Sequence, residues 1–235
     1  MKEIKDCGII DCFVKTPEIL AFNHLQKNLP FPCFYHFVGQ LELDTLDTQS
    51  HSSYIILGSA SHITEKLIWH KRLAEFIHSK LKQNIPVLGI CFGHQLMCDY
   101  FGCEVNYSNI EEIKATGPRK IIMNTNMVND FNPTYTHWVS HSQKVHKLST
   151  EMIQIGQSHH QLHGENLYDV VIHSQLPFIG TQLHPEMDLL NSKRVDREGH
   201  EISKQELNQI QNEGLDFIEH SFNYLIKNYL IKSDK

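Results

Sequence analysis

One of the six cysteines, Cys91, stands in the sequence G-I-C-F-G between an apolar run and a stretch with helical character. The run PVLGI (86–90) predicts a buried strand, and GHQLMCDYF (93–101) predicts a helix, so Cys91 falls in the turn between them. Gly89 and Gly93 let the chain turn sharply and hold the thiol above the sheet edge. Since a helix N-terminus favours a thiolate, this turn predicts a nucleophile; the alternative is a buried core thiol.

A nucleophilic thiol needs a base, and the segment FIGTQLHPE (178–186) offers His184 at the end of a predicted strand. Pro185 stiffens the chain by fixing φ, and Glu186 follows two residues after the histidine. Residues i and i+2 of an extended segment point the same way, so this carboxylate can orient the imidazole. The sequence therefore predicts a triad of Cys91, His184 and Glu186, against the alternative of an incidental His and Glu in a surface loop.

A second group of polar side chains, in SHHQLHGE (158–165), raises metal binding as an alternative function. Two histidines four residues apart suit a metal only on a helix, and Gly164 with its polar neighbours favours a loop or hairpin end. We therefore expect a solvated loop, and neither a metal nor another cofactor. The residues concerned are His159, His160, His163 and Glu165.

Composition and charge exclude several classes of protein. The 235 residues include 21 Lys and Arg against 27 Asp and Glu, a formal charge of −6, and no long basic run that would follow a phosphate backbone. The N-terminal sequence MKEIKDCGIIDCFV contains neither a readable signal peptide nor a membrane span. We expect a cytoplasmic protein with reduced thiols that binds neither nucleic acid nor membrane.

Short apolar runs predict the strands that must position these residues. Besides 86–90, they cover residues 7–14, 33–38, 52–57, 119–124, 152–158, 168–174 and 178–184. Helices are expected from Thr16 as N-cap, over 64–83, and over 215–230, where Leu215, Ile218, Phe222, Leu225 and Tyr229 form an inner stripe.

After residue 118, turns replace the connecting helices. The pattern predicts one domain over residues 1–235, with a mainly parallel sheet extended by antiparallel strands. The charged segment 191–211 is interpreted as a polar insertion, either a mobile flap or a peripheral helix.

The two motifs together resemble the class I glutamine amidotransferases, whose elbow has the form G-x-C-x-G-x-Q and whose triad is completed by a distant H-P-E. Here the matching residues are Gly89, Cys91, Gly93 and Gln95, then His184, Pro185 and Glu186. WVSHSQKV (138–145) is similar to the amidotransferase domain of GMP synthetase and its stand-alone relatives. The resemblance implies a flavodoxin-like three-layer α/β/α sandwich with the nucleophile at the carboxyl ends of the parallel strands.

The resemblance also implies roles for residues around the thiol. The backbone amides of Gly58, Ser59 and Phe92 would form the oxyanion hole. Gln95 and the loop of Ser140, His141 and Ser142 would line the substrate pocket. Two departures concern these loops. Ala60 stands where relatives carry proline, which predicts a looser turn, and Ser142-Gln143 replaces the family's Gly-Asp, which leaves the preferred amide open.

The implied activity is hydrolysis of the glutamine side-chain amide through a cysteinyl thioester, with release of ammonia. The chain has no P-loop, so the ammonia acceptor would be a separate synthetase subunit, or the protein would act alone. A γ-glutamyl peptidase or hydrolase with the same triad, and an inactive binding or regulatory relative, stay as alternatives. Trp138 is expected in the core, and His94 is assigned no catalytic role.

Overall fold

A computed structural model describes residues 4–38, 46, 49–107, 115–158, 167–192, 195 and 199–230. Nine strands form a mixed sheet in the order β2-β1-β3-β4-β11-β10-β9-β6-β7. Its parallel half consists of β2 (Cys33–Phe37), β1 (Cys7–Asp11), β3 (Tyr54–Ile56), β4 (Val87–Ile90) and β11 (Phe178–Thr181). Its antiparallel half consists of β10 (Val170–His173), β9 (Met152–Ser158), β6 (Ala115–Met123) and β7 (Thr134–His141).

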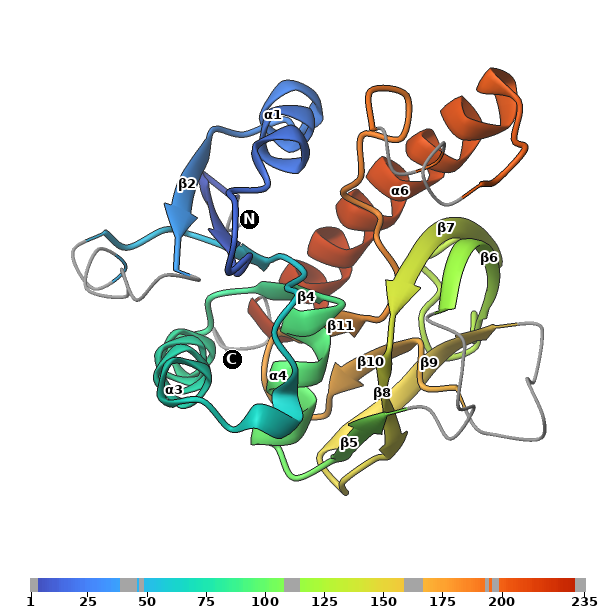
Figure 1. Cartoon of the computed structure of the whole chain (residues 1–235). Coiled ribbons are helices and arrows are strands. Elements are labelled where there is room, and N and C mark those ends of the chain that lie inside the picture. Colours follow the sequence, from blue (N-terminus) through green and yellow to red (C-terminus); the bar gives the residue numbers. More distant parts are fainter. Residues whose placement is uncertain are drawn as a thin grey trace.

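Helices cover both faces of this sheet (Figure 1). On one face, α1 (Ile19–Asn28) and α6 (Lys204–Leu225) bury apolar side chains in a shared core. On the other face, α3 (Ile68–Lys82) and α4 (Phe92–Tyr100) build a second core against the same strands. The predicted three-layer α/β/α architecture, with antiparallel strands added to a parallel sheet, is confirmed. None of the helices in the described ranges is long and apolar enough to cross a membrane.

Apolar periodicity did not predict three of the strands. β5 (Glu104–Tyr107) and β8 (Gln143–Lys147) form a separate antiparallel pair, and β7 is the edge strand of the main sheet. β5 buries only Val105 of its four side chains, so it carries no periodic apolar signal. Pairing between distant segments, rather than local sequence, makes these residues extended.

The first helix begins later than predicted, because a distant carboxylate caps it. Its N-cap is Glu18 rather than Thr16, and no side chain of the cap residue itself accepts a hydrogen bond. Instead Asp11, the last residue of β1, accepts from the amide of Glu18 at 2.6 Å and from that of Phe13 at 2.9 Å. Asp11 thus holds the whole β1–α1 loop, a long-range contact that local capping signals could not reveal.

The helix predicted over 64–83 is split in two. A short 3-10 turn, η1 (Ile63–Glu65), ends at Lys66, whose φ of 50° is left-handed, and α3 begins after Leu67. The left-handed residue Lys66 reverses the chain between η1 and α3. η1 therefore stays near the carboxyl ends of the strands, while α3 runs along the sheet.

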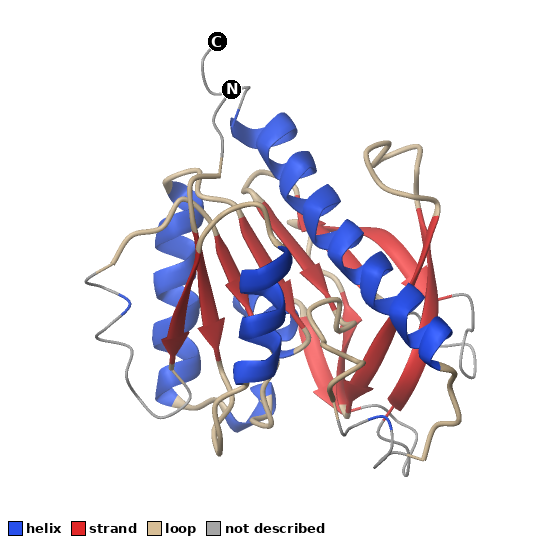
Figure 2. Cartoon of the chain, turned by 90° about the horizontal axis from the view of Figure 1, so that it is seen from above, coloured by secondary structure: helices blue, strands red, loops and turns tan. Residues whose placement is uncertain are grey.

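The C-terminal helix is longer than predicted, and the proposed insertion is correspondingly shorter. α6 begins at Lys204, so residues 204–211 are its first two turns and not a flap, and it runs diagonally across the sheet before η3 (Ile226–Leu230) (Figure 2). Ser203 caps it by accepting from Glu206 N at 3.2 Å, and the Glu206 carboxylate accepts from Ser203 N at 3.0 Å. The motif S-K-Q-E is a capping box that the sequence already displays.

The inner stripe of α6 also differs from the prediction. Ile218, Phe222 and Leu225 are buried as expected, whereas Leu215 is half-buried and Phe217 is fully buried. Gly214 is buried too, and a Cβ there would lie 2.4 Å from the carbonyl oxygen of Pro185. The missing side chain therefore lets α6 pack directly on the His-Pro-Glu segment.

Candidate active site

A cavity of about 550 Å³ opens at the carboxyl ends of the parallel strands. Its lining comes from the loops after β1, β3, β4 and β11, together with the junction of β7 and β8. Ligands bind in this place in open α/β sheets, because neighbouring loops diverge there. The cavity is lined by Cys91, His184 and Glu186, by Gly58 and Ser59, and by Gln95, Ser140, His141 and Ser142.

Cys91 occupies a strained turn at the N-terminus of α4. Its φ of 49° and ψ of −97° lie outside the regions that ordinary residues prefer. The strain is held by close backbone packing, because a Cβ on Gly89 would lie 2.8 Å from Gly93 C, and one on Gly93 would lie 2.6 Å from Ile56 O. The Cys91 amide donates to Thr181 O at 2.8 Å, which fixes the turn to β11. The predicted elbow is therefore present.

His184 lies directly beyond β11, in an isolated bridge with Trp138 of β7. Its backbone amide donates to Trp138 O at 2.8 Å, and its Nδ1 is 2.8 Å from Glu186 Oε1. Burial lowers the pKa of this imidazole, but the electrostatic interactions with Glu186 and Cys91, together with the hydrogen bond to Glu186, outweigh burial and raise the pKa. The site therefore favours the protonated form of His184.

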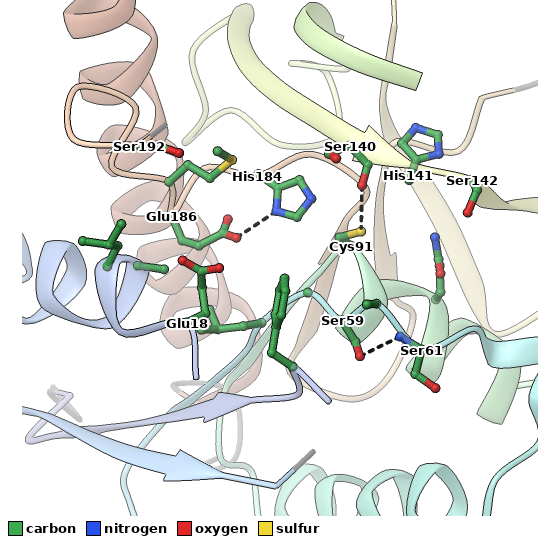
Figure 3. Close-up of a pocket in the computed structure, with 18 of the residues that line it drawn as sticks. Glu18, Ser59, Ser61, Cys91, Ser140, His141, Ser142, His184, Glu186 and Ser192 are labelled. Atoms are coloured by element: carbon green, nitrogen blue, oxygen red, sulfur yellow. Dashed lines mark hydrogen bonds and ion pairs between the residues drawn. The ribbon is translucent and has the colours of Figure 1, made fainter. Parts of the chain in front are cut away.

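The three side chains of the predicted triad lie together (Figure 3). His184 stands between Cys91 and Glu186, and its Nε2 has no hydrogen-bond partner in the described part of the chain. Gly58 lines the same corner, since a Cβ on it would lie 3.0 Å from His184 Cε1 and 3.7 Å from Cys91 Cβ. A side chain at this position would push the imidazole away from the sulfur.

The loop after β3 is better braced than Ala60 suggests. Ser59 Oγ donates to Cys12 O at 2.6 Å and accepts from Ser61 N at 3.0 Å. Ser61 Oγ in turn donates to Glu65 Oε2 at 2.6 Å and lies 2.9 Å from His70 Nε2. These side-chain hydrogen bonds brace the loop at the position where the sequence lacks the stiffening that proline would give.

The predicted oxyanion-hole amides come from two segments beside Cys91, the loop after β3 and the first residue of α4. Phe92 is the first residue of α4, where a helix leaves its amide without an internal partner. Within the described ranges, the amides of Gly58 and Ser59 have no acceptor either. These N–H groups are available to a bound oxyanion.

The opposite wall of the cavity is formed by the end of β7 and the start of β8. Ser140 O lies 4.0 Å from Cys91 Sγ, and His141 turns its Nδ1 to Gln143 O at 3.1 Å. Burial and then the positive charge of Arg119 lower the pKa of His141 to about 3, so this histidine is neutral. Arg119 Nη1 is 3.4 Å from His141 Nε2 and 3.3 Å from Asp169 Oδ1.

Gln95 and Gln143 occupy this wall in different ways. Gln95 Nε2 donates to Gln143 O at 2.7 Å and to Gln182 Oε1 at 3.0 Å. The Gln143 side chain points away to η1, where it accepts from Ile63 N at 2.8 Å and donates to Thr64 Oγ1 at 2.7 Å. Gln143 thus braces two loops and contributes its carbonyl, rather than a side chain, to the wall.

One residue close to the nucleophile, Gln182, was not predicted from the sequence. Its Nε2 is 3.6 Å from Cys91 Sγ, and its side chain is almost fully buried behind the cavity. It stands two residues before His184, so the alternation that pairs His184 with Glu186 also places Gln182 on the same side. That spacing was a usable signal.

Other candidate residues have structural positions. Trp138 is fully buried, as expected. His94 is buried against β11, and burial lowers its pKa to about 3, which fits the absence of a role. All six cysteines are unpaired. The cluster His159, His160, His163 and Glu165 lies outside the described residues, and within them no group of three or more His, Cys, Asp or Glu side chains could hold a metal ion.

The fold and the cavity together define an α/β protein with a cysteine-centred site at the carboxyl edge of its sheet. Sequence comparison identifies a family of this class. The family model of class I glutamine amidotransferases matches residues 42–198. The chain belongs to this family.

Curated relatives include subunits of glutamine-hydrolysing GMP synthase. The subunit from Methanopyrus kandleri is 29% identical over 111 residues, which cover 47% of this chain and 57% of that protein. The corresponding subunit from Methanothermobacter thermautotrophicus is 31% identical over 52% of this chain and 59% of its own length. The GMP synthase of Prochlorococcus marinus is 29% identical over 76% of this chain and 31% of its own length. The chain thus matches between about a third and three fifths of these relatives.

Solved structures share the fold at low identity. A putative GMP synthase subunit from Thermoplasma acidophilum superposes with a TM-score of 0.70 at 17% identity, covering 99% of this chain and all of the other. A glutamine amidotransferase from Thermotoga maritima gives 0.66 at 16% identity, covering 97% of this chain and all of its own. They confirm the flavodoxin-like fold.

Proposed function

We propose that this chain hydrolyses the side-chain amide of glutamine and releases ammonia. The observation that carries the proposal is the position of His184, whose Nδ1 is bonded to Glu186 at 2.8 Å while its unpartnered Nε2 faces the side of Cys91. A nucleophile, a base and a residue that orients the base are the parts that covalent amide hydrolysis needs. Family membership supports the same chemistry.

In this mechanism the Cys91 thiolate attacks the amide carbonyl, and the tetrahedral oxyanion is held by the amides of Phe92 and of Gly58 or Ser59. His184, protonated at Nε2, gives that proton to the departing nitrogen as the carbon–nitrogen bond breaks. Ammonia leaves, and a γ-glutamyl thioester stays on Cys91. His184 then takes a proton from water as its oxygen attacks the thioester carbonyl. The carbon–sulfur bond breaks, glutamate leaves, and the thiolate and imidazolium are restored.

The amino-acid end of glutamine is assigned to the wall that contains Gln95 and the Ser140–Ser142 segment. Gln95 uses its Nε2 within the protein, so its Oε1 is left as an acceptor, and no described residue donates to it. An acceptor at the cavity wall suits the α-ammonium group of the substrate.

A separate synthetase subunit is the proposed ammonia acceptor. The support for this is that relatives of this chain are named as one subunit of glutamine-hydrolysing GMP synthase. The reaction described uses only side chains and backbone amides of this chain, and none of its steps calls for a metal or another cofactor.

A γ-glutamyl hydrolase is the second candidate, because the cavity continues past Glu186 towards α1. Its far end is lined by Glu18, Leu20 and Asp188, and its volume of about 550 Å³ is within the range that holds ligands larger than an amino acid. A leaving group larger than ammonia has room there.

An ammonia-release assay with glutamine tests the proposal. Cys91→Ala should reduce release to background, whereas Cys33→Ala, at a similarly buried thiol on β2, should retain it. A glutamine analogue with an electrophilic carbon in place of the amide should label Cys91 alone. γ-Glutamyl peptides tested in parallel would release an amino acid if the second candidate is correct. Absence of both turnover and labelling would leave a binding or regulatory relative.

A further inference from the structure

Behind the cavity, a backbone carbonyl and the side chains of Gln95 and Gln182 form a continuous hydrogen-bonded relay that ends on Cys91. Gln95 Nε2 lies 2.7 Å from Gln143 O and 3.0 Å from Gln182 Oε1, and Gln182 Nε2 lies 3.6 Å from Cys91 Sγ. Gln95 and Gln182 are 4% and 2% exposed, so water does not compete for these bonds. Gln182 does not line the cavity.

The polarity of this relay is determined by a backbone group. The Gln143 carbonyl can only accept, so Gln95 must turn its NH₂ group towards it. The second N–H of that group reaches Gln182, which must therefore present its oxygen to Gln95. Its NH₂ group then points at the sulfur. An amide that could otherwise face either way is thus fixed as a donor to Cys91.

The sulfur has a second polar neighbour of opposite character. Ser140 O, 4.0 Å away, can accept only from a protonated thiol, whereas the Gln182 amide can only donate, which favours a thiolate. Gln182 is also tied to the sheet, because its backbone amide donates to Asp169 O at 2.8 Å. The donor is therefore presented from a rigid base.

We propose that Gln182 is a positioning residue that stabilises the Cys91 thiolate from behind the pocket and couples the sulfur, through Gln95, to the substrate-binding wall. The inference deepens the proposed function and rests on it, because it assigns a contribution to the nucleophile of that reaction. The substrate does not touch Gln182, so the effect is on the charge and orientation of the sulfur.

The pH dependence of Cys91 alkylation by iodoacetamide tests this inference without requiring turnover. Gln182→Met removes the donor at nearly the same size, and Gln182→Glu keeps the oxygen that accepts from Gln95 but places negative charge near the sulfur. A hydrogen bond to a charged group corresponds to about one to two pH units. The midpoint of alkylation should therefore rise by about one unit in Gln182→Met and by more in Gln182→Glu.

Gln175→Met is the matched control, since Gln175 is exposed in the turn before β11 and its side chain makes no bond to the described residues. It should keep the wild-type midpoint. In Gln182→Met, kcat for glutamine should fall about tenfold while KM changes less than about threefold, because a lower thiolate fraction acts on the reaction step. The midpoint is compared only for variants whose circular dichroism matches that of the wild type, because unfolding would itself expose the thiol and move the midpoint.

An unchanged midpoint in both Gln182 variants would overturn the inference, even if activity were lost. If Gln182→Met does not fold, as judged by circular dichroism, Gln182→Glu alone decides, because it retains the size and the bond to Gln95. A shifted midpoint together with a wild type that leaves glutamine intact would support the role of Gln182 and reject the proposed function.

Discussion

Two buried histidines line the same cavity on opposite sides of Cys91, and their surroundings make one of them charged and leave the other neutral. His184 is 7% exposed and His141 is 8% exposed, so burial does not distinguish them. The carboxylate on Nδ1 of His184 outweighs burial and raises its pKa, whereas burial and then the nearby guanidinium of Arg119 lower the pKa of His141 to about 3, because the carbonyl on its Nδ1 does not offset them.

The partner, rather than the residue type or its burial, therefore decides what each pocket histidine can do. The His184 imidazole, on one wall of the cavity, can hold and transfer a proton. The His141 imidazole, on the other wall, stays neutral and offers hydrogen bonds. A second difference lies in the support of each wall. α6 packs against Pro185 through Gly214, whereas His141 is backed by Arg119 and the buried Asp169.

Replacing each histidine by glutamine should give the largest contrast. His184→Gln removes the only proposed base and should lower kcat by about 10⁴-fold or more. His141→Gln keeps a group that can bond to Gln143 O and should change kcat/KM by less than about tenfold. Ammonia release under single-turnover and steady-state conditions measures both, and comparable losses in the two variants would break the distinction between the walls.

Removing the charge beside His184 should have the next largest effect. Glu186→Gln keeps the size of the side chain but allows the wrong imidazole tautomer, so kcat should fall about 10²- to 10⁴-fold. Cys91 should still be labelled by an electrophilic glutamine analogue, because the thiol and the pocket are intact. Unchanged turnover would exclude Glu186 from the triad.

A change in the support of the His184 wall should have a moderate effect. In Gly214→Ala the new Cβ would lie 2.4 Å from Pro185 O, so either α6 or the segment that contains Pro185 must shift. We expect a loss of about 1–3 kcal/mol in the free energy of unfolding and about a tenfold loss of kcat. Asn212→Ala, on the exposed side of α6, is the control and should change neither quantity appreciably in urea unfolding and activity assays.

The two histidines should also give the stability of the fold an opposite pH dependence. Below pH 6.5 the His141 imidazole is protonated in the unfolded chain but stays neutral in the folded chain. The contribution of His141 to the free energy of unfolding therefore falls as the pH drops from 6.5 towards 3. For His184, with its raised pKa, the contribution is complete below 6.5 and falls as the pH rises through the folded pKa.

Urea unfolding across this pH range measures both contributions. His141→Gln should reduce the slope of the free energy of unfolding against pH, below pH 6.5, by up to about 1.4 kcal/mol per pH unit. The slope that remains on this acid limb is due to other buried histidines such as His94 and His137. His184→Gln should flatten the alkaline limb instead. If both variants flattened the same limb, the two histidines would not differ in charge.

Much of this site could be predicted from local sequence. The elbow of Gly89, Cys91 and Gly93 and the pair His184 and Glu186 follow from turn chemistry and from the two-residue period of an extended chain. The same period contained Gln182, and S-K-Q-E contained the start of α6, so those two omissions came from signals that were present in the sequence.

Other features had no local signal. The start of α1 depends on Asp11, and the firmness of the Gly58–Ser61 loop depends on Cys12 O, His70 and Glu65. β5 and β8 are strands because they pair with each other. Each of these depends on a partner that only folding brings near.

By itself, the sequence determined which side chains meet as the proposed nucleophile and base, and at which sheet edge, because local backbone geometry and side-chain spacing encode their positions. Only the tertiary structure decided which charges surround each histidine, which way the Gln182 amide points, and how closely α6 approaches Pro185. Those properties depend on distances between segments remote in the chain, and electrostatic and hydrogen-bond energies are set by such distances.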